Sequence, residues 1–406
     1  MFSMNKKISL GICISLIIIA ITATFAITMV VSGKIYNGIV SDISQRSSSS
    51  ASVAEIAEIV NNYYYGEVDD NSKLNSAVIR GYVNGLSDGS SIYLDAAEYA
   101  AYKSKIEGGV KGVGVETAFN YRTGRFVITH VYEGSPAQNA GLKVNDTITA
   151  IGDVAVNMAN FAKIRESLYG NILTTVKIEY ERDGETKVVE PMLGFSIPSV
   201  SGRLEGNIGY IKISGFYKNT ADEFQKITES LIEQGAEKMI FDVRNTSAGT
   251  IEYAARVIDV IVPFNRGGTI AVVKDEKGNV YKDMSFAAEK NSITMPFVVL
   301  VNGYTSGPAE LFACDLRDIS QAQVVGTQTA GVGTMQELFP LEDGGAVLLT
   351  VALVEPKGNA EAVYHGIGIT PTKEEKIVTG DDLNIDLLEP KDDNQLQAAF
   401  SLLGNQ

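Results

Sequence analysis

Cysteine and histidine are scarce in this sequence of 406 residues. The two cysteines are Cys13, inside an apolar run, and Cys314, far downstream, so a disulfide framework is excluded. The two histidines are His130 and His365, and without a Cys/His cluster a zinc site of the usual ligand types is not expected. We expect no metal and no cofactor, and a Ser-His-Asp triad would have to use one of the two histidines.

Basic residues are outnumbered, because 34 Lys and Arg face 49 Asp and Glu, which gives a net charge of −15. Such a chain lacks the basic surface that binds phosphate backbones, so nucleic acid is not an expected partner. At about 150 residues per domain, the length predicts two or three domains with a sizeable core. No internal repeat of fixed period is visible, so a solenoid or propeller is not supported.

A run without charged residues extends from Ile8 to Val31. Since about 20 apolar residues cross a bilayer as a helix, residues 8–31 are predicted to span a membrane. Lys6 and Lys7 precede the run, which by the positive-inside tendency leaves residues 1–7 in the cytoplasm and the body outside, at the cell surface or in the periplasm. The alternative is a cleaved signal peptide, although its apolar core usually has only about 7–15 residues.

The remaining chain divides by pattern. Serine-rich residues 32–53 are predicted to be a linker, and the apolar spacing of residues 54–107 favours a segment of two or three short helices. Short β-rich runs fill residues 108–193. Strands alternate with helices in residues 194–375, including a strand from Lys238 to Val243 and a helix from about Glu252 to Val260, which indicates a mixed α/β fold. Residues 376–406 are interpreted as a tail, in which Asp381–Asp382 and Asp392–Asp393 are a solvated charge run.

Several motifs along this body together resemble those of one protein family. They are Asp88-Gly-Ser-Ser-Ile-Tyr-Leu94, Gly134-Ser-Pro-Ala-Gln-Asn-Ala-Gly-Leu142 followed by Asn145-Asp146, Ile208-Gly-Tyr-Ile-Lys-Ile213 and Gly366-Ile-Gly-Ile-Thr-Pro371. In this order the chain resembles the carboxy-terminal processing peptidases, or tail-specific proteases, from Tyr63 to about Pro371. The resemblance implies an α/β core of the crotonase or ClpP-like type, with residues 108–193 as a PDZ domain.

The family's mechanism uses a serine at a strand-to-helix turn, a lysine 25 residues later as base, and a glutamine four residues beyond. In this chain Phe297 to Asn302 is the expected strand, and Pro308, with Glu310 in the first turn, marks the helix start. Laying the motif on Tyr304-Thr-Ser-Gly-Pro-Ala-Glu-Leu311 puts Gly307 at the serine position and Val332 at the lysine position, while Gln336 retains the glutamine. Nucleophile and base are both missing.

The family's oxyanion turn, Asn-Asn-Pro-Gly-Gly, corresponds here to Asn245-Thr-Ser-Ala-Gly249. Ala248 replaces its first glycine and Gly249 keeps the second. Ser306 is a possible displaced nucleophile, but leading into or capping the helix would explain it without any base. Thr305 and Ser247 are weaker candidates, because neither has a lysine or histidine at a suitable spacing. His365 is interpreted as a surface or edge-strand histidine and not as a general base.

The PDZ part predicts a binding site. In Gly112-Val113-Gly114-Val115 the glycines allow backbone N–H groups to turn inward and accept a chain-terminal carboxylate, next to a strand edge that could pair with a peptide. The alternative is that these glycines only shape a turn. The sequence as a whole predicts a membrane-anchored PDZ protein that binds protein or peptide C-termini without cleaving them. The rival hypotheses are an active serine endopeptidase and a structural or assembly protein.

Overall fold

The computed structural model describes residues 51–67, 71–170, 174–262, 268–286, 293–357, 362–378 and 382–404. By its contacts the chain separates into Met1–Ala77 and Val78–Gln406. In the first unit residues 51–63 are helical. The helix α2 (Asn71–Asn84) begins in the first unit and ends in the second. The predicted membrane span, residues 8–31, lies outside the described residues, and within the described ones no helix has the length and apolarity needed to cross a membrane.

The second unit contains the PDZ domain, whose antiparallel sheet has the order β3-β4-β5-β7-β8, with β6 (Val154–Ala155) paired to β5. Its other strands are β3 (Val115–Asn120), β4 (Arg125–Val131), β5 (Thr147–Ile151), β7 (Ile178–Arg182) and β8 (Glu185–Val189). Short helical segments accompany them: α4 (Pro136–Asn139), α5 (Phe161–Arg165) and η1 (Glu166–Leu168). A single cluster of buried apolar side chains, including Phe126, Ile128 and Ile148, forms its core.

The α/β core is built on a sheet of order β10-β11-β12-β15-β16-β19. Its strands are β10 (Val200–Glu205), β11 (Ile208–Ile213), β12 (Lys238–Asp242), β15 (Phe297–Val301), β16 (Gln323–Gly326) and β19 (Lys373–Glu374). β10 is antiparallel to β11, and the other neighbours are parallel. Parallel strands need crossover connections, and the helices α6 (Thr220–Glu233), α7 (Ile251–Ile261) and α8 (Pro308–Ser320) provide them.

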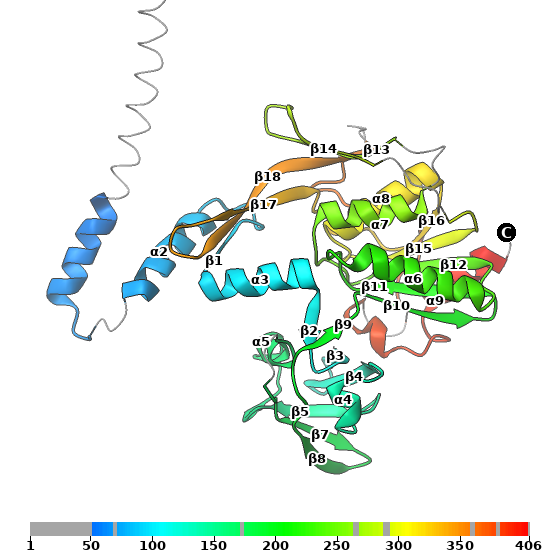
Figure 1. The fold of residues 1–406 in the computed structure, drawn as a ribbon, viewed down its shortest axis with the longest axis horizontal. Coiled ribbons are helices and arrows are strands. Elements are labelled where there is room, and N and C mark those ends of the chain that lie inside the picture. Colours follow the sequence, from blue (N-terminus) through cyan, green and yellow to red (C-terminus); the bar gives the residue numbers. More distant parts are fainter. Residues whose placement is uncertain are drawn as a thin grey trace, which may run out of the picture. The chain divides into compact units, whose positions relative to one another are not determined.

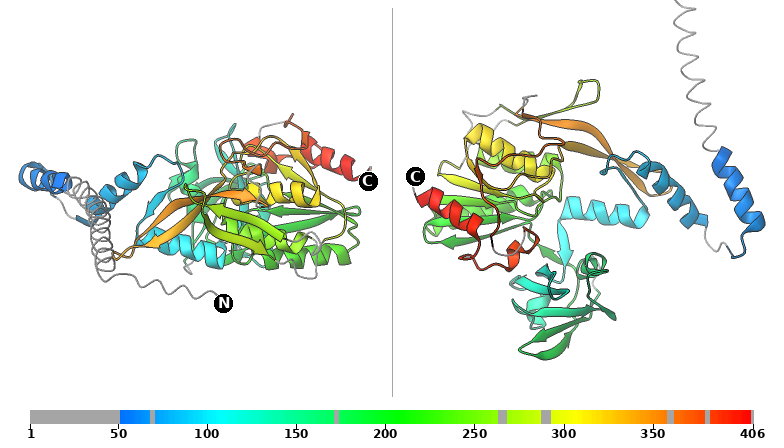
Figure 2. Two further views of the ribbon diagram at one scale, coloured as in Figure 1. Left: turned by 90° about the horizontal axis from the view of Figure 1, so that it is seen from above. Right: turned by 180° about the vertical axis from the view of Figure 1, so that it is seen from behind.

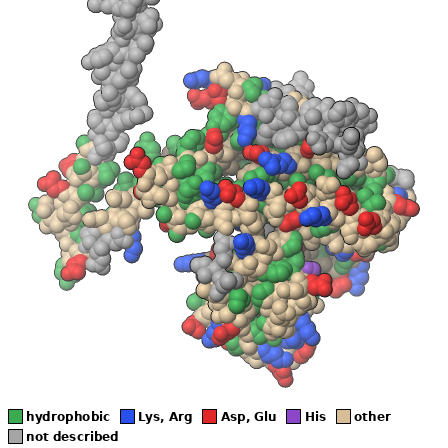
Figure 3. Space-filling model, in the orientation of Figure 1, with side chains coloured by type: hydrophobic (Ala, Val, Ile, Leu, Met, Phe, Trp, Pro, Cys, Tyr) green, Lys and Arg blue, Asp and Glu red, His purple; other side chains and the backbone are tan. Residues whose placement is uncertain are grey.

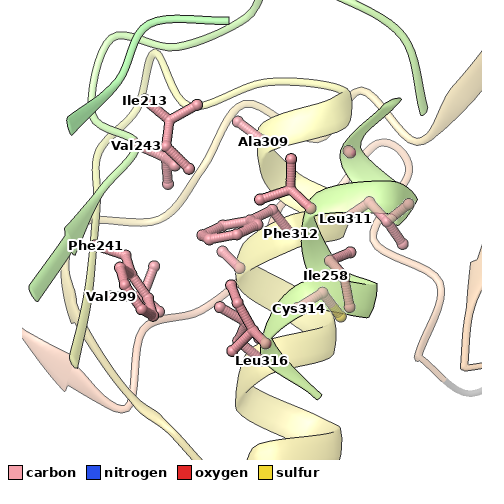
Figure 4. Packing of buried hydrophobic residues seen from close by; sticks show 14 of the residues in the cluster. Ile213, Phe241, Val243, Ile258, Val299, Ala309, Leu311, Phe312, Cys314 and Leu316 are labelled. Carbon is pink, nitrogen blue, oxygen red and sulfur yellow. The ribbon is translucent and has the colours of Figure 1, made fainter. Parts of the chain in front are cut away.

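Alternation along the strands places apolar side chains on both faces of this sheet. Phe241 and Val299 belong to the cluster that packs against α6, α7 and α8, whereas Ile240 and Val298 belong to a second cluster with the C-terminal helix α9 (Asn394–Gly404). Figure 1 shows α6 and α7 in front of the sheet, and the rear view in Figure 2 shows α9, in red, on the opposite side. Phe312 of α8 points towards the sheet residues Phe241 and Val299 (Figure 4).

The predicted tail is therefore wrong for residues 394–404, which form a covering layer of the core. Leu396, Ala399 and Leu403 are buried in the second cluster. Apolar spacing in Asn394–Gly404 is typical of a helix that buries one face. The aspartate pair that precedes α9 is divided, since Asp392 is exposed and Asp393 is 4% exposed. The interpretation as a solvated charge run holds for Asp392 and is wrong for Asp393.

A second sheet has the order β1-β18-β13-β14, and β17 pairs with β18 in a long hairpin (Figure 1). Its strands are β1 (Ile92–Leu94), β13 (Gly268–Lys274), β14 (Val280–Phe286), β17 (Thr334–Pro340) and β18 (Ala346–Pro356). The segment predicted as purely helical thus contributes the strand β1, followed by α3 (Ala96–Gly108), which begins at the capping residue Asp95. β2 (Val110–Gly112) then pairs with β9 (Phe195–Ile197), where the chain enters and leaves the PDZ domain.

Candidate functional site

The turn from β15 to α8 lies at the position where the nucleophile was expected. The strand ends at Val301 and the helix begins at Pro308, as predicted. Thr305 is buried, and its hydroxyl donates a hydrogen bond to the carbonyl of Val243 at 2.9 Å, which ties this turn to the end of β12. Gly307 immediately precedes the helix with φ 58° and ψ −114°, a backbone conformation that favours glycine. Gly307 therefore fits this turn but offers no hydroxyl.

The positions expected to hold serine and lysine are neighbours in space. A Cβ atom placed on Gly307 would lie 3.9 Å from the carbonyl oxygen of Val332. This is an ordinary van der Waals distance, so a side chain at position 307 would meet no obstruction there. The structure brings together two residues that the sequence separates by 332 − 307 = 25 positions. Neither residue supplies a group that transfers protons.

Glu310 holds these two positions together. It lies in the first turn of α8 and is completely buried. One carboxylate oxygen accepts hydrogen bonds from the backbone N–H groups of Gly307 at 3.0 Å and Val332 at 2.7 Å. The other accepts the N–H of Gly331 at 2.7 Å and the hydroxyl of Thr329. Sequence reasoning noticed Glu310 only as a mark of the helix start, and the four donors that converge on it are the new information.

The predicted oxyanion turn follows β12 and is fixed by two asparagines. The Asn302 amide donates to the side-chain oxygen of Asn245 at 2.8 Å, and the Asn245 N–H donates to the Asn302 side chain at 3.0 Å. Further along the turn, the carbonyl of Ala248 accepts the N–H of Phe216 at 2.9 Å. Gly249 has φ 110°, and a Cβ there would lie 2.0 Å from the Phe216 carbonyl oxygen, so only glycine fits. The turn has a defined shape with Ala248 at the position where the resemblance expects a glycine.

Ser306 belongs to the turn from β15 to α8 and is hydrogen-bonded to the oxyanion turn. It is half-buried, its N–H donates to the carbonyl of Thr246 at 3.0 Å, and its own carbonyl accepts the N–H of Ala309 at 3.2 Å. The N-cap position belongs to Gly307, so Ser306 leads into the helix through its backbone and does not cap it. Gln336 lies on β17, where its amide donates to the hydroxyl of Thr334 at 3.2 Å.

A buried ionic cluster directly precedes the oxyanion turn. Arg244 is 2% exposed, and its guanidinium contacts Asp242 at 2.6 Å and Asp393 at 2.8 Å. Burial alone would raise the pKa of Asp242, but the neighbouring guanidinium holds this pKa below its usual range. Gln395 accepts a further hydrogen bond from Arg244 at 3.0 Å, so the start of α9 is bound to the end of β12. Sequence analysis missed this cluster. The signal that could have indicated it is the pair of Asp242 and Arg244 at the end of a buried strand.

The glycine segment of the PDZ domain is only partly available to a ligand. The N–H of Val113 donates to the carbonyl of Leu168 at 3.0 Å, and a Cβ on Gly112 would lie 2.5 Å from that oxygen. For Val113 the predicted free, inward N–H is wrong, because η1 already accepts it. Gly114 has φ 88° and packs against Ser135, while Val115 is buried and starts β3. β3 ends its sheet, so the expected strand edge next to the glycines is present.

A cleft of about 580 Å³ extends from this edge to the oxyanion turn. Its PDZ side includes Val115, Glu116 and Thr117 of β3 with Arg165, Glu166, Tyr169 and Gly170, and its core side includes Ser214, Tyr217, Asn245, Thr246 and Ala248. A peptide paired to β3 would therefore lie in the same cleft as the turn. Over the described ranges, no group of three or more His, Cys, Asp or Glu is placed to hold a metal ion.

Comparisons with known proteins agree with this architecture. Residues 207–374 match the model of peptidase family S41, and residues 127–182 match a PDZ domain. The carboxy-terminal processing protease CtpA of Bacillus subtilis is 30% identical over 298 residues, which are 73% of this chain and 62% of that protein. A probable CtpA-like serine protease of Staphylococcus aureus (strain COL) is 27% identical over 361 residues, 88% of this chain and 71% of that protein.

Among solved structures, a putative S41 protease from Bacteroides fragilis superimposes with a TM-score of 0.57 at 17% identity, covering 84% of this chain and 92% of that one. This likeness concerns the fold alone. The PDZ match, the S41 match that follows it and the similarity to CtpA identify the protein as a member of the carboxy-terminal processing peptidase family, that is, of peptidase family S41 with a PDZ domain.

Proposed function

We propose that the protein is a membrane-anchored, extracytoplasmic member of this family that binds protein or peptide C-termini and does not cleave them. One observation supports the loss of cleavage above all: Gly307 and Val332, which the resemblance aligns with the family's nucleophile and base, are neighbours in space. A serine hydroxyl is a poor nucleophile at neutral pH unless a base removes its proton, and here both groups are missing. Because such groups act as a unit, losing either one costs orders of magnitude in rate.

The binding part of the proposal is supported by the strand edge and the cleft. β3 ends its sheet, and its residues Val115 to Thr117 line the cleft that reaches the oxyanion turn. An extended peptide can add to such an edge through main-chain hydrogen bonds, which is how PDZ domains bind chain ends. Binding should weaken when the peptide carboxylate is amidated. Equal binding of free-acid and amidated peptides would favour a structural or assembly role.

The anchoring part depends on the uncharged run from Ile8 to Val31 and the lysines before it. Protease added to intact cells should degrade the body while the protein fractionates with membranes. Recovery of the full-length protein in the soluble cytosolic fraction would contradict this arrangement.

The decisive test of lost cleavage is to restore both groups. The purified protein should neither cleave an unfolded protein substrate nor react with a serine-directed fluorophosphonate probe. The double variant Gly307→Ser/Val332→Lys should gain cleavage, with each single variant as the matched control that lacks one partner. Labelling of the unmodified protein that Ser306→Ala abolishes would show a displaced nucleophile and an active endopeptidase.

A further inference from the structure

Basic side chains surround the cleft of an otherwise acidic protein. Of the cationic residues that line it, Lys105 belongs to α3, Lys111 to β2 and Arg165 to α5. The first and last are exposed and Lys111 is half-buried. We propose that the chain end bound in this cleft is acidic, with Asp or Glu among the residues before its carboxylate. This inference rests on the proposed binding function and specifies the ligand class.

The three cations differ from the other two basic residues of the cleft. Lys212 forms an ion pair with Asp386, and Arg244 is neutralised by Asp242 and Asp393. Among the described residues, by contrast, no ion pair involves Lys105, Lys111 or Arg165. Their charge is therefore available to a ligand.

Two acidic residues of the cleft offset part of this charge. Glu116 and Glu166 remain after the paired Asp386 is set aside, so the unpaired groups sum to 3 − 2 = +1. Glu116 already accepts a hydrogen bond from the Tyr132 hydroxyl. The whole chain carries a net charge of −15, and acidic and basic side chains are interspersed over the face seen in Figure 3. The positive balance of the cleft is thus a local property, opposite in sign to that of the protein.

Lys111 can compensate for the backbone donor that the glycine segment does not offer to a carboxylate. Since the N–H of Val113 is bonded to Leu168, fewer backbone donors remain for a carboxylate. Lys111 directly precedes Gly112 and lines the cleft, so its ammonium group can supply the attraction instead. Arg165 lines the same cleft together with β3, where it can reach acidic side chains of a peptide paired to that strand.

The test measures fluorescence anisotropy of the full-length protein in detergent with three labelled heptapeptides. One has two glutamates and a free carboxylate, one has glutamines in their place, and one is the glutamate peptide with an amidated end. An exposed ion pair changes affinity by roughly 1.5- to 5-fold at low ionic strength, so two pairs predict about 2- to 25-fold tighter binding of the glutamate peptide. The preference should shrink as salt is raised to about 0.5 M, because added ions screen exposed charges.

The variant Lys105→Glu/Lys111→Glu/Arg165→Glu should invert the preference. Lys163→Glu is the matched control, because Lys163 is exposed on the same helix as Arg165 but does not line the cleft. Equal affinity for the glutamate and glutamine peptides would overturn the acidic ligand and leave the binding function intact. Failure of all three peptides to bind would overturn both. A glutamate preference that survives the triple substitution would refute the assignment to these three residues.

Discussion

Glu310→Gln is the substitution that tests the structure of the candidate site around Gly307 and Val332 most directly. The glutamate is completely buried and accepts four hydrogen bonds, three of them from backbone N–H groups. Glutamine has nearly the same shape, but its amide nitrogen cannot accept. The variant therefore keeps the packing and removes acceptors, which separates the hydrogen bonds from the volume of the side chain.

The expected loss follows from the less costly orientation of the new amide. If its nitrogen replaces the oxygen that faces Thr329 and Gly331, the Thr329 hydroxyl can rotate and accept from the new amide, whereas the backbone N–H of Gly331 is left without an acceptor. A hydrogen bond to a charged group contributes about 1.5–3 kcal/mol, so we expect the free energy of unfolding to fall by that amount. The opposite orientation would leave the N–H groups of Gly307 and Val332 unpaired and cost more.

Urea unfolding followed by circular dichroism measures this change, with Glu342→Gln as the control at an exposed position. Amide hydrogen exchange should also become faster at Gly331. A loss below about 0.5 kcal/mol, the range of ordinary surface substitutions, would refute the four-donor arrangement around Glu310.

Two further predictions concern buried carboxyl groups. Asp393→Ala removes a partner of a buried arginine and should destabilise the protein by about 3 kcal/mol in urea unfolding, whereas Asp392→Ala at the exposed neighbour should have little effect. Burial and the nearby Asp318 raise the pKa of Asp315, whose two carboxyl oxygens have no hydrogen-bond partner among the described residues. Its charge thus costs stability above its unfolded pKa, and Asp315→Asn should stabilise at pH 7 but not near pH 4; a gain that is equal at both values would contradict this sign.

Local sequence signals predicted the elements that frame the site. A short apolar run followed by proline and an acidic residue indicated β15 and α8, and the structure has Phe297–Val301 and Pro308–Ser320. The predicted strand from Lys238 to Val243 and the predicted helix from about Glu252 to Val260 correspond to Lys238–Asp242 and Ile251–Ile261 in the structure. These elements were accessible because their periodicity and end signals lie within about ten residues of each other.

What the sequence did not reveal depends on partners that are distant along the chain. Ile92–Leu94 is a strand because it pairs with β18. The local sequence pattern does not indicate which distant segment will be its partner. Asp393 is buried because it forms an ion pair with Arg244, which is distant along the chain. A carboxylate is normally solvated, so only knowledge of the guanidinium partner could have separated Asp393 from Asp392. Likewise, the engagement of the Val113 N–H by Leu168 follows from the position of η1 and not from the glycines.

The retained geometry around Gly307 has a physical explanation. The contacts that hold the turn are made by backbone groups, since Glu310 binds the N–H groups of residues 307, 331 and 332, and Ser306 donates its N–H to Thr246. None of these bonds depends on the side chain at position 307 or 332. With glycine and valine at these positions the frame stays intact, and glycine adopts the φ of 58° at less cost than other residues would. A cleft next to this intact turn is the arrangement that we expect under the proposed function, in which chain ends are bound and not cleaved.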